Sequence, residues 1–295
     1  MHIIWSYGSL LLSVFLWGSS FIVFKVAVNF YSPLVIIFFR MLIASLIFCL
    51  IWPKIRPSKI TLDDLKLICL MCLFEPCLYF LLEGYALKYT SASQASIIVS
   101  TLPLMVATAS FFILKEKVNL KVIIAFLVSI LGVIVLTFNS DVNVSSQNPL
   151  LGNFLELLAM VMATGYIILA RYLGSKFHPF FLAFAQAALG TIFFFPLVLL
   201  FDNFFLLKFS FWPFLSVLYL GVMVTFLAYS LYNFSLTRIQ AAKAAAFTNF
   251  IPAVSIILSF FLLGERLNYN QVLGVVLIVV GIISQNFSFS RFKKH

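Results

Sequence analysis

Charge is scarce in this chain. Charged residues make up 9% of its 295 residues, whereas hydrophobic residues make up 63% and the mean hydropathy is +1.14. A soluble domain carries about 25% charged residues, so this chain has too few of them to cover a water-facing surface. The composition excludes a soluble globular protein and predicts one whose surface faces lipid.

Several kinds of chemical site are missing as well. The chain has three histidines and contains neither an H-E-x-x-H motif nor a G-x-S-x-G motif with a usable histidine. It has no G-x-x-x-x-G-K-[ST] loop for ATP. Four cysteines, two of them in a Cys69-x-x-Cys72 pair, complete neither a metal site nor a disulfide framework. These absences predict no metal, no cofactor and no enzymatic activity.

Long apolar segments follow one another along the chain. A membrane-spanning helix needs about 20 apolar residues. Ten such segments are separated by breaks at Pro, Asn and His-Pro: 7–28, 33–52, 65–86, 91–114, 120–138, 152–174, 180–201, 211–232, 241–263 and 269–288. The sequence therefore predicts an all-α integral membrane protein with ten transmembrane helices.

The second half of the chain repeats the first. Residues 84–136 align with residues 233–285 without a gap, at a spacing of 149 residues. The matched pairs include Pro103 with Pro252 and Glu116 with Glu265. We expect one five-helix repeat in 1–140, a second in 150–290 and a basic tail in 291–295. Because five is odd, the second repeat should be inverted, as in transporters that bind substrate near the membrane midplane.

Lys and Arg are distributed unevenly between the connections. The formal net charge is +10, but the chain has no basic run of the kind that a nucleic-acid groove needs. Connections such as 53–59 and 115–121 are basic, whereas the alternate connections hold only Lys88, Lys208 and Arg266. Positive residues stay on the cytoplasmic side. This predicts a multi-pass protein of the cell (inner) membrane with cytoplasmic N- and C-termini that binds no nucleic acid.

Short motifs add a family resemblance. They are Trp17-Gly18-Ser19-Ser20-Phe21, Phe39-Arg40, Ala86-Leu87-x-Tyr89-Thr90-Ser91-Ala92 and Leu263-Gly264-Glu265-Arg266-Leu267. In this order, and with the doubled unit, the chain resembles the EamA group of the drug/metabolite transporter superfamily over its whole length. The resemblance implies ten helices in two inverted five-helix repeats, and the family includes amino-acid and metabolite exporters. The second half departs from the pattern, since it lacks a clear Trp-Gly motif and has Gln186 in place of Arg40.

Pro103 and Pro252 lie near the middle of the predicted fourth and ninth spans. A proline inside a helix removes a backbone hydrogen bond, and in a membrane the freed carbonyl needs a neighbour, water or a ligand. Matched interruptions in two halves of a transporter point to its binding site. We expect these prolines to act as hinges, with fixed kinks that only shape packing as the alternative.

Glu75 lies near the middle of the predicted third span, and Tyr79 and Glu83 follow on the same helix face. Acidic groups are costly in lipid, so this face should line a cavity or meet another helix. Glu75 is interpreted as the only mid-span acid and hence as the candidate for proton coupling. Glu83 lies nearer the outer end and could reach the interface.

Arg40 in the second span and Lys25 at the end of the first, on one face with Trp17, are the candidate cations. One interpretation pairs each cation with Glu75 or Glu83, which would neutralise charge in a low dielectric. The other has one of them hold a substrate carboxylate or phosphate, for which the geometry of Arg is suited.

Neutral polar residues complete the candidate site. They could orient an amphipathic metabolite or simply join helices by hydrogen bonds. They are Thr225, Tyr229 and Asn233 in the eighth span, Thr248 and Asn249 in the ninth, and Thr164 and Tyr166 in the sixth. The predicted substrate-binding set is Trp17, Arg40, Glu75, Tyr79, Tyr166, Tyr229 and Asn249.

The preferred interpretation is a secondary transporter that exports a small organic solute, an amino acid or related metabolite, by alternating access. Its partners would be that solute and the lipid bilayer, with proton coupling as an option, and it would act as a monomer or homodimer. The alternatives are an intramembrane enzyme, an uptake permease for a nucleotide-like metabolite and a scaffold that transports nothing.

Overall fold

The computed structural model describes residues 2–114, 124, 127–128, 131–132, 134–135, 147–202, 210–239, 241–269, 272–277 and 280. These residues form helices and short connections, and no strand occurs among them. Eight helical segments are long and apolar enough to cross a membrane: Ile4–Ala27, Pro33–Ile55, Leu62–Tyr89, Ala92–Ala109, Pro149–Leu173, Pro179–Phe201, Phe211–Leu236 and Ala244–Leu263. They confirm eight of the predicted spans. The predicted spans 120–138 and 269–288 lie largely outside the described residues, and the tail 291–295 lies entirely outside.

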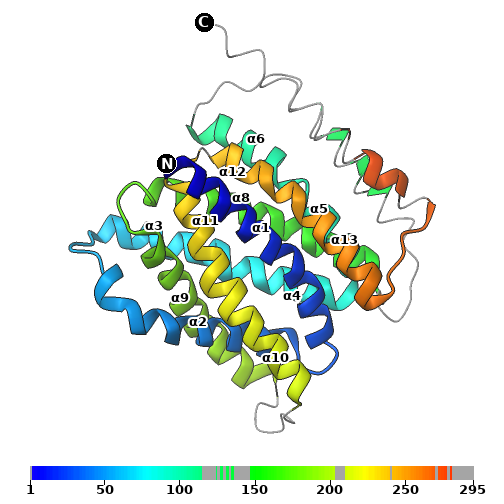
Figure 1. Cartoon of the computed structure of the whole chain (residues 1–295), viewed down its shortest axis with the longest axis horizontal. Helices are drawn as coiled ribbons and strands as arrows, with labels where there is room; N and C mark the ends of the chain where they lie inside the picture. Colours follow the sequence, from blue (N-terminus) through cyan, green and yellow to red (C-terminus); the bar gives the residue numbers. More distant parts are fainter. Residues whose placement is uncertain are drawn as a thin grey trace, which may run out of the picture.

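Several spans consist of more than one helical piece. The first repeat contains α1 (His2–Ala27), α2 (Pro33–Ile55), α3 (Leu62–Cys72), η1 (Leu73–Leu78), α4 (Tyr79–Tyr89), α5 (Ala92–Val99) and α6 (Leu102–Leu114). The second contains α8 (Pro149–Leu173), α9 (Pro179–Phe201), α10 (Phe211–Tyr219), η3 (Leu220–Ala228), α11 (Tyr229–Leu236), α12 (Ala241–Ala246), η4 (Phe247–Asn249) and α13 (Phe250–Leu263). Figure 1 shows α1 lying between α11 on one side and α5 and α13 on the other.

Among the described residues, three helices (α2, α8 and α9) begin at a proline that follows a polar residue. α2 begins at Pro33, and the Ser32 side chain accepts a backbone N–H of its first turn at 3.3 Å. α8 begins at Pro149, and Asn148 accepts in the same way at 3.2 Å. Proline has no N–H to leave unpaired in a first turn, and a polar side chain before it satisfies one that would be. Pro33 and Pro149, which mark breaks between predicted spans, are therefore the first residues of helices.

The two repeats pack against each other reciprocally. α1 of the first repeat contacts η3, α11 and α13 of the second, and α8 of the second contacts η1, α4, α5 and α6 of the first. α2 contacts α9, which is its counterpart. In a two-fold arrangement, when one element of the first repeat meets another element of the second, the equivalents of these two elements meet as well. The repeat in the sequence is thus matched by a repeat in the packing.

Both repeats interrupt their fourth helix at equivalent positions. The turn at Ser100–Thr101 separates α5 from α6, and the 3₁₀ turn η4 ends at Asn249, which is the repeat equivalent of Ser100. Pro103 and Pro252 therefore lie in the first turn of the helix after the interruption, and not inside a continuous helix. A first-turn proline costs little, because that N–H has no partner within the helix. The hinge role of the two prolines stays a prediction.

A cation closes the end of the third span in each repeat. Lys25 Nζ donates to the carbonyl oxygens of Leu87 and Thr90 at 2.6 Å each. Arg171, which matches Lys25 at a spacing of 146 residues, donates to the carbonyl of Leu236, which matches Leu87 at the spacing of 149. Free carbonyls at a helix C-terminus favour a cation. The interpretation that Lys25 pairs with an acid of the third span is wrong, since within the described residues it forms no ion pair.

Glu265 joins the two repeats at the start of α5. Its carboxylate accepts the backbone N–H of Ala92 at 3.2 Å, and the N–H and Oγ–H of Ser93 at 3.0 and 2.8 Å. A carboxylate at a helix N-terminus satisfies free N–H groups and complements the helix dipole. Glu265 therefore acts at a helix end, while its repeat equivalent Glu116 lies outside the described residues.

Replacing Glu265 with alanine should lower the stability of the folded protein. Hydrogen bonds to a charged group are worth about 1.5–3 kcal/mol each in net terms, so the loss should exceed 1.5 kcal/mol. The midpoint of thermal unfolding in detergent measures it. Glu265→Gln, which keeps an acceptor oxygen, should lose less, and exposed Arg266→Ala is the control. An alanine variant as stable as wild type would show that this contact does not stabilise the fold.

Candidate functional site

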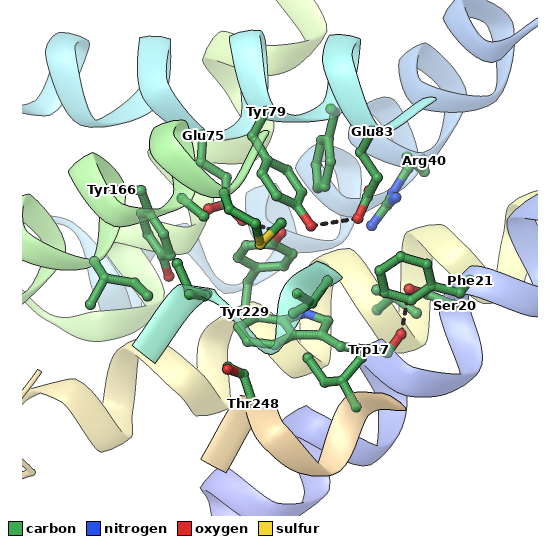
Figure 2. Close-up of a pocket in the computed structure, with 18 residues that line it drawn as sticks. Trp17, Ser20, Phe21, Arg40, Glu75, Tyr79, Glu83, Tyr166, Tyr229 and Thr248 are labelled. Carbon is green, nitrogen blue, oxygen red and sulfur yellow. Dashed lines mark hydrogen bonds between the residues drawn. The ribbon is translucent and has the colours of Figure 1, made fainter. Parts of the chain in front are cut away.

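A cavity of about 490 Å³ lies between the two repeats. The first repeat lines it with side chains of α1, α2, η1, α4, α5 and α6, and the second with side chains of α8, η3, α11, η4 and α13. Figure 2 shows several of these side chains around the cavity. Its wall includes Trp17, Phe21, Phe80, Tyr166 and Tyr229 as aromatic groups and Arg40, Glu75 and Glu83 as charged groups. A smaller cavity of about 180 Å³ shares Phe80 and Tyr229 with it. This is where the sequence places a transporter's binding site.

The Glu75 side chain is presented by a break in the third span. Over Leu73–Leu78 the helix widens, and Glu75 has an extended backbone conformation (φ −147°, ψ 116°) directly before Pro76. The Gln186 amide donates to the Glu75 carbonyl at 3.1 Å, which satisfies a backbone oxygen beside the break. The Tyr229 hydroxyl donates to the Glu75 carboxyl. Pro76 is the signal in the sequence that could have predicted this interruption.

Glu83 faces the cavity and does not reach the membrane interface. It is 7% exposed, and the Tyr79 hydroxyl donates to its carboxyl (Figure 2). Glu75, Tyr79 and Glu83 all line the same cavity, so the predicted polar face of the third span is brought together. The interpretation of Glu83 as an interfacial side chain is wrong, because packing leaves it no path to the surface.

Arg40 lies in the cavity wall without an acidic partner. Its side chain is 2% exposed, its guanidinium carbon lies 4.2 Å from the centre of the Phe80 ring, and Nε donates to Thr225 Oγ1 at 2.9 Å. Glu75 and Glu83 are near enough to attract it electrostatically. Neither carboxyl forms an ion pair with it, however, in the part of the chain that the structure describes. The predicted neutralising pair is absent there.

Aromatic rings form one side of the cavity. The Trp17 ring lies 5.2 Å from that of Tyr229 and 4.6 Å from that of Tyr232, measured between centroids. The Tyr166 hydroxyl donates to Asn233 Oδ1 at 2.7 Å. The Trp17 indole N–H is buried and finds no acceptor within the described ranges. Buried polar groups are nearly always hydrogen-bonded, so this donor is available to a bound molecule.

The interrupted fourth helices also border the cavity. Val99 and Leu102 flank the first interruption, and their repeat equivalents Thr248 and Ile251 flank the second; all four line the cavity. Asn249 does not line it, and its buried Oδ1 has no partner among the described residues. Of the predicted substrate-binding set, the structure thus places all but Asn249 around one cavity.

Glu156 is not among the site residues predicted from the sequence. It lies inside α8, is 0% exposed, and neither of its carboxyl oxygens has a hydrogen-bond partner within the described part of the chain. The third span is therefore not the only one that carries a buried acid, although Glu156 lies nearer a helix end than Glu75 does. Gly152 and Asn153 precede Glu156 on the same helix face, and this group of small and polar residues is the signal that could have placed it against another helix.

The cavity combines a cation, two carboxyls, aromatic rings and an unused N–H donor. No group of three or more His, Cys, Asp or Glu side chains that could hold a metal ion occurs among the described residues. The arrangement can hold a small amphipathic molecule, with an anionic group at Arg40 and an apolar part against the rings.

Comparison with known proteins gives a consistent result. The EamA-like transporter family matches residues 4–138 and 150–286. An uncharacterized transporter of Archaeoglobus fulgidus is 29% identical, over 92% of this chain and 95% of its own. The uncharacterized transporter YcxC of Bacillus subtilis is 27% identical, over 98% of this chain and 95% of its own. A solved crystal structure shares the fold with a TM-score of 0.69 at 14% identity, covering 98% of this chain and 99% of that one.

Proposed function

Because the chain belongs to the EamA-like transporter family, we propose that this multi-pass membrane transporter exports a small amphipathic solute bearing a carboxylate. An amino acid or a related metabolite fits this description. The observation that carries the proposal is Arg40, a buried cation in the cavity wall without an acidic partner in the described residues. Charge inside a membrane protein is costly unless it is paired, and a bound carboxylate would pair it.

The rest of the cavity suits the remainder of such a solute. Arg presents several N–H donors in a planar fork that matches a carboxylate, and among the described residues only Nε is used, by Thr225. Trp17 and Tyr229 offer flat apolar surfaces for a side chain, and the Trp17 N–H offers one more donor. Glu75 lies across the cavity, where it would attract an ammonium group or carry a proton.

Alternating access is the mechanism that the duplicated architecture supports. The cavity lies between two reciprocally packed repeats, and the interrupted helix of each repeat borders it. Motion of one repeat against the other would open the site to each side in turn. The chain has no ATP-binding loop, so transport would follow the solute gradient or couple to protons. The outward direction rests on the resemblance to amino-acid exporters.

Solute counterflow in proteoliposomes tests this function. The purified protein should exchange at least one labelled amino acid or related carboxylate, chosen from a panel that also contains nucleotides and sugars. Recovery of the label in unchanged solute separates a transporter from an intramembrane enzyme. Exchange of nucleotides alone would favour the uptake permease, and no exchange of any member would contradict the proposal. Faster loss of the preloaded solute from cells that produce the protein tests the export direction.

The inverted orientation predicts that equivalent connections lie on opposite sides of the membrane. Single cysteines would replace Lys59, between α2 and α3, and Asn203, after α9, in a variant whose four native cysteines are removed. An impermeant thiol reagent should reach Lys59→Cys only from the cytoplasm and Asn203→Cys only from outside. Labelling of both from the same side would contradict the inversion and the cytoplasmic termini.

A further inference from the structure

Glu156 is a buried carboxyl group to which the described residues donate no hydrogen bond. It lies seven residues after the start of α8, about 10 Å below that end of the helix. Its side chain is fully buried, and neither oxygen has a hydrogen-bond partner among the described residues. An ionised carboxylate in such a place loses its hydration and gains nothing in return. Glu156 is therefore expected to carry a proton.

Glu156 lies on the face of α8 that meets α4. One turn earlier, a Cβ added to Gly152 would lie 2.7 Å from Thr90 Cβ and 3.0 Å from the carbonyl oxygen of Ala86, so the two helices are in close contact there. Beside it, Asn153 Oδ1 accepts a hydrogen bond from Thr90 at 2.7 Å. This contact excludes water from the region around Glu156.

Glu83 is the group on α4 that faces Glu156. It lies one turn before Ala86, as Glu156 lies one turn after Gly152, and the two carboxyls interact electrostatically. Glu83 also lines the cavity, whereas Glu156 does not. Two carboxyls that interact in a low dielectric disfavour each other's ionised form. Glu83 thus faces the cavity, whereas Glu156 lies away from it, in the packed contact between α8 and α4.

We propose that Glu83 and Glu156 form a proton-binding carboxyl pair, separate from Glu75, that exchanges its proton with the cavity through Glu83. Glu83 is the member that ionises, since Arg40 attracts it and Tyr79 donates to it. Glu156 keeps the proton. In the proposed transport cycle, on which this last step rests, a proton that enters the cavity binds this pair through Glu83 before it reaches Glu75.

The charged and titratable groups near the pair lie on α2, η1, α4 and α11. In the described part of the chain, Glu156 faces Glu83 and Tyr79 of α4, and no titratable group of α3, α5, α6 or α12 interacts with it. The groups that face Glu83 are Tyr79, Arg40 of α2, Glu75 of η1, Tyr229 of α11 and Glu156 itself. Arg40 is the one cation among them, and it lies on the cavity side.

Infrared spectroscopy of the full-length protein in lipid nanodiscs tests the pair without any solute. All samples carry Glu75→Gln, so that Glu75 cannot contribute. At neutral pH the spectrum should contain a C=O stretching band of a protonated carboxyl that shifts in D₂O. Glu156→Gln should remove this band, because Glu83 alone ionises beside Arg40. Glu83→Gln should keep it, because Glu156 stays dry. Glu265→Gln, at a carboxylate with three donors, is the control and should leave the band unchanged.

Three results would overturn the proposal. The first is a band that persists in Glu156→Gln. The second is a band that disappears in Glu83→Gln, which also decides the matter if Glu156→Gln does not fold. The third is a band in the parent protein that is lost on replacing choline chloride with sodium chloride at constant pH, since this would indicate a metal cation in place of the proton. None of these readings depends on the solute, so failure of the proposed transport function would be seen separately, in the counterflow assay.

Discussion

Arg40→Gln is expected to lower the affinity for carboxylate solutes by about 30-fold or more while leaving a folded protein in the membrane. Truncating one partner of a buried, hydrogen-bonded charge pair costs about 2–5 kcal/mol, and every 1.4 kcal/mol is a factor of ten in affinity. The fold should survive, because glutamine can still donate to Thr225 and no acidic partner is left unpaired in the described residues. Counterflow at a series of solute concentrations measures the change.

Two controls separate charge from shape at this position. Arg40→Lys keeps the charge but not the planar fork, so it should retain part of the affinity. Thr225→Val removes only the group that orients Nε, so it should cost less than either change at Arg40. The amide analogue of the solute should bind wild type poorly and should lose little further in Arg40→Gln. If that variant transports the carboxylate as wild type does, Arg40 is not the solute's partner.

Glu75→Gln is expected to abolish solute accumulation driven by a pH gradient while leaving solute exchange at least partly intact. Glutamine preserves the shape of the side chain and can accept the bond from Tyr229, so the site should remain assembled. It cannot take up or release a proton, however, and coupling needs a group whose proton occupancy changes as the site opens to each side. Accumulation under an imposed pH gradient, compared with counterflow at equal pH, measures the two properties separately.

Tyr229→Phe is the matched control for Glu75. It removes the hydroxyl that donates to the carboxyl but leaves the carboxyl able to titrate, so accumulation should continue with a changed rate. Because Glu75 forms no ion pair with Arg40 in the described residues, Glu75→Gln should not cost stability. Accumulation by Glu75→Gln with an unchanged pH profile would identify another coupling site or a uniporter.

The repeat in the sequence predicted more of the structure than the hydropathy did. Its register of 149 residues relates the two helix interruptions, and it relates the carbonyls of Leu87 and Leu236 to which the cations at the ends of the third spans donate. The hydropathy pattern located eight spans that the structure contains. It predicted, however, that Pro103 and Pro252 lie inside continuous helices, whereas they lie in the first turns of α6 and α13. Whether a proline bends a helix or starts a new one depends on whether neighbouring groups satisfy the free carbonyls, and that is a tertiary property.

The candidate site was only partly predictable for a related reason. Glu75 and Tyr79 could be assigned to one helix face from their spacing, and Arg40 from its place inside an apolar segment. Glu156 could not be assigned in this way, because its distance from a helix end does not tell whether it faces water or α4. Asn249 was predicted to line the cavity but does not, because a local turn directs the neighbouring Thr248 to the cavity in its place.

The lysine that closes the third span has a consequence for biosynthesis. Lys25 bonds to carbonyls 62 and 65 residues further along the chain, and Arg171 to one 65 residues further along. When the first helix of either repeat leaves the translocation machinery, the segment that will neutralise its cation has not yet been made. We therefore expect that helix to stay near the insertion channel, or at the headgroup boundary, until two more spans have followed. Each repeat thus matures in a unit of three spans, and a ribosome stalled before Leu87 should leave Lys25 open to an amine reagent.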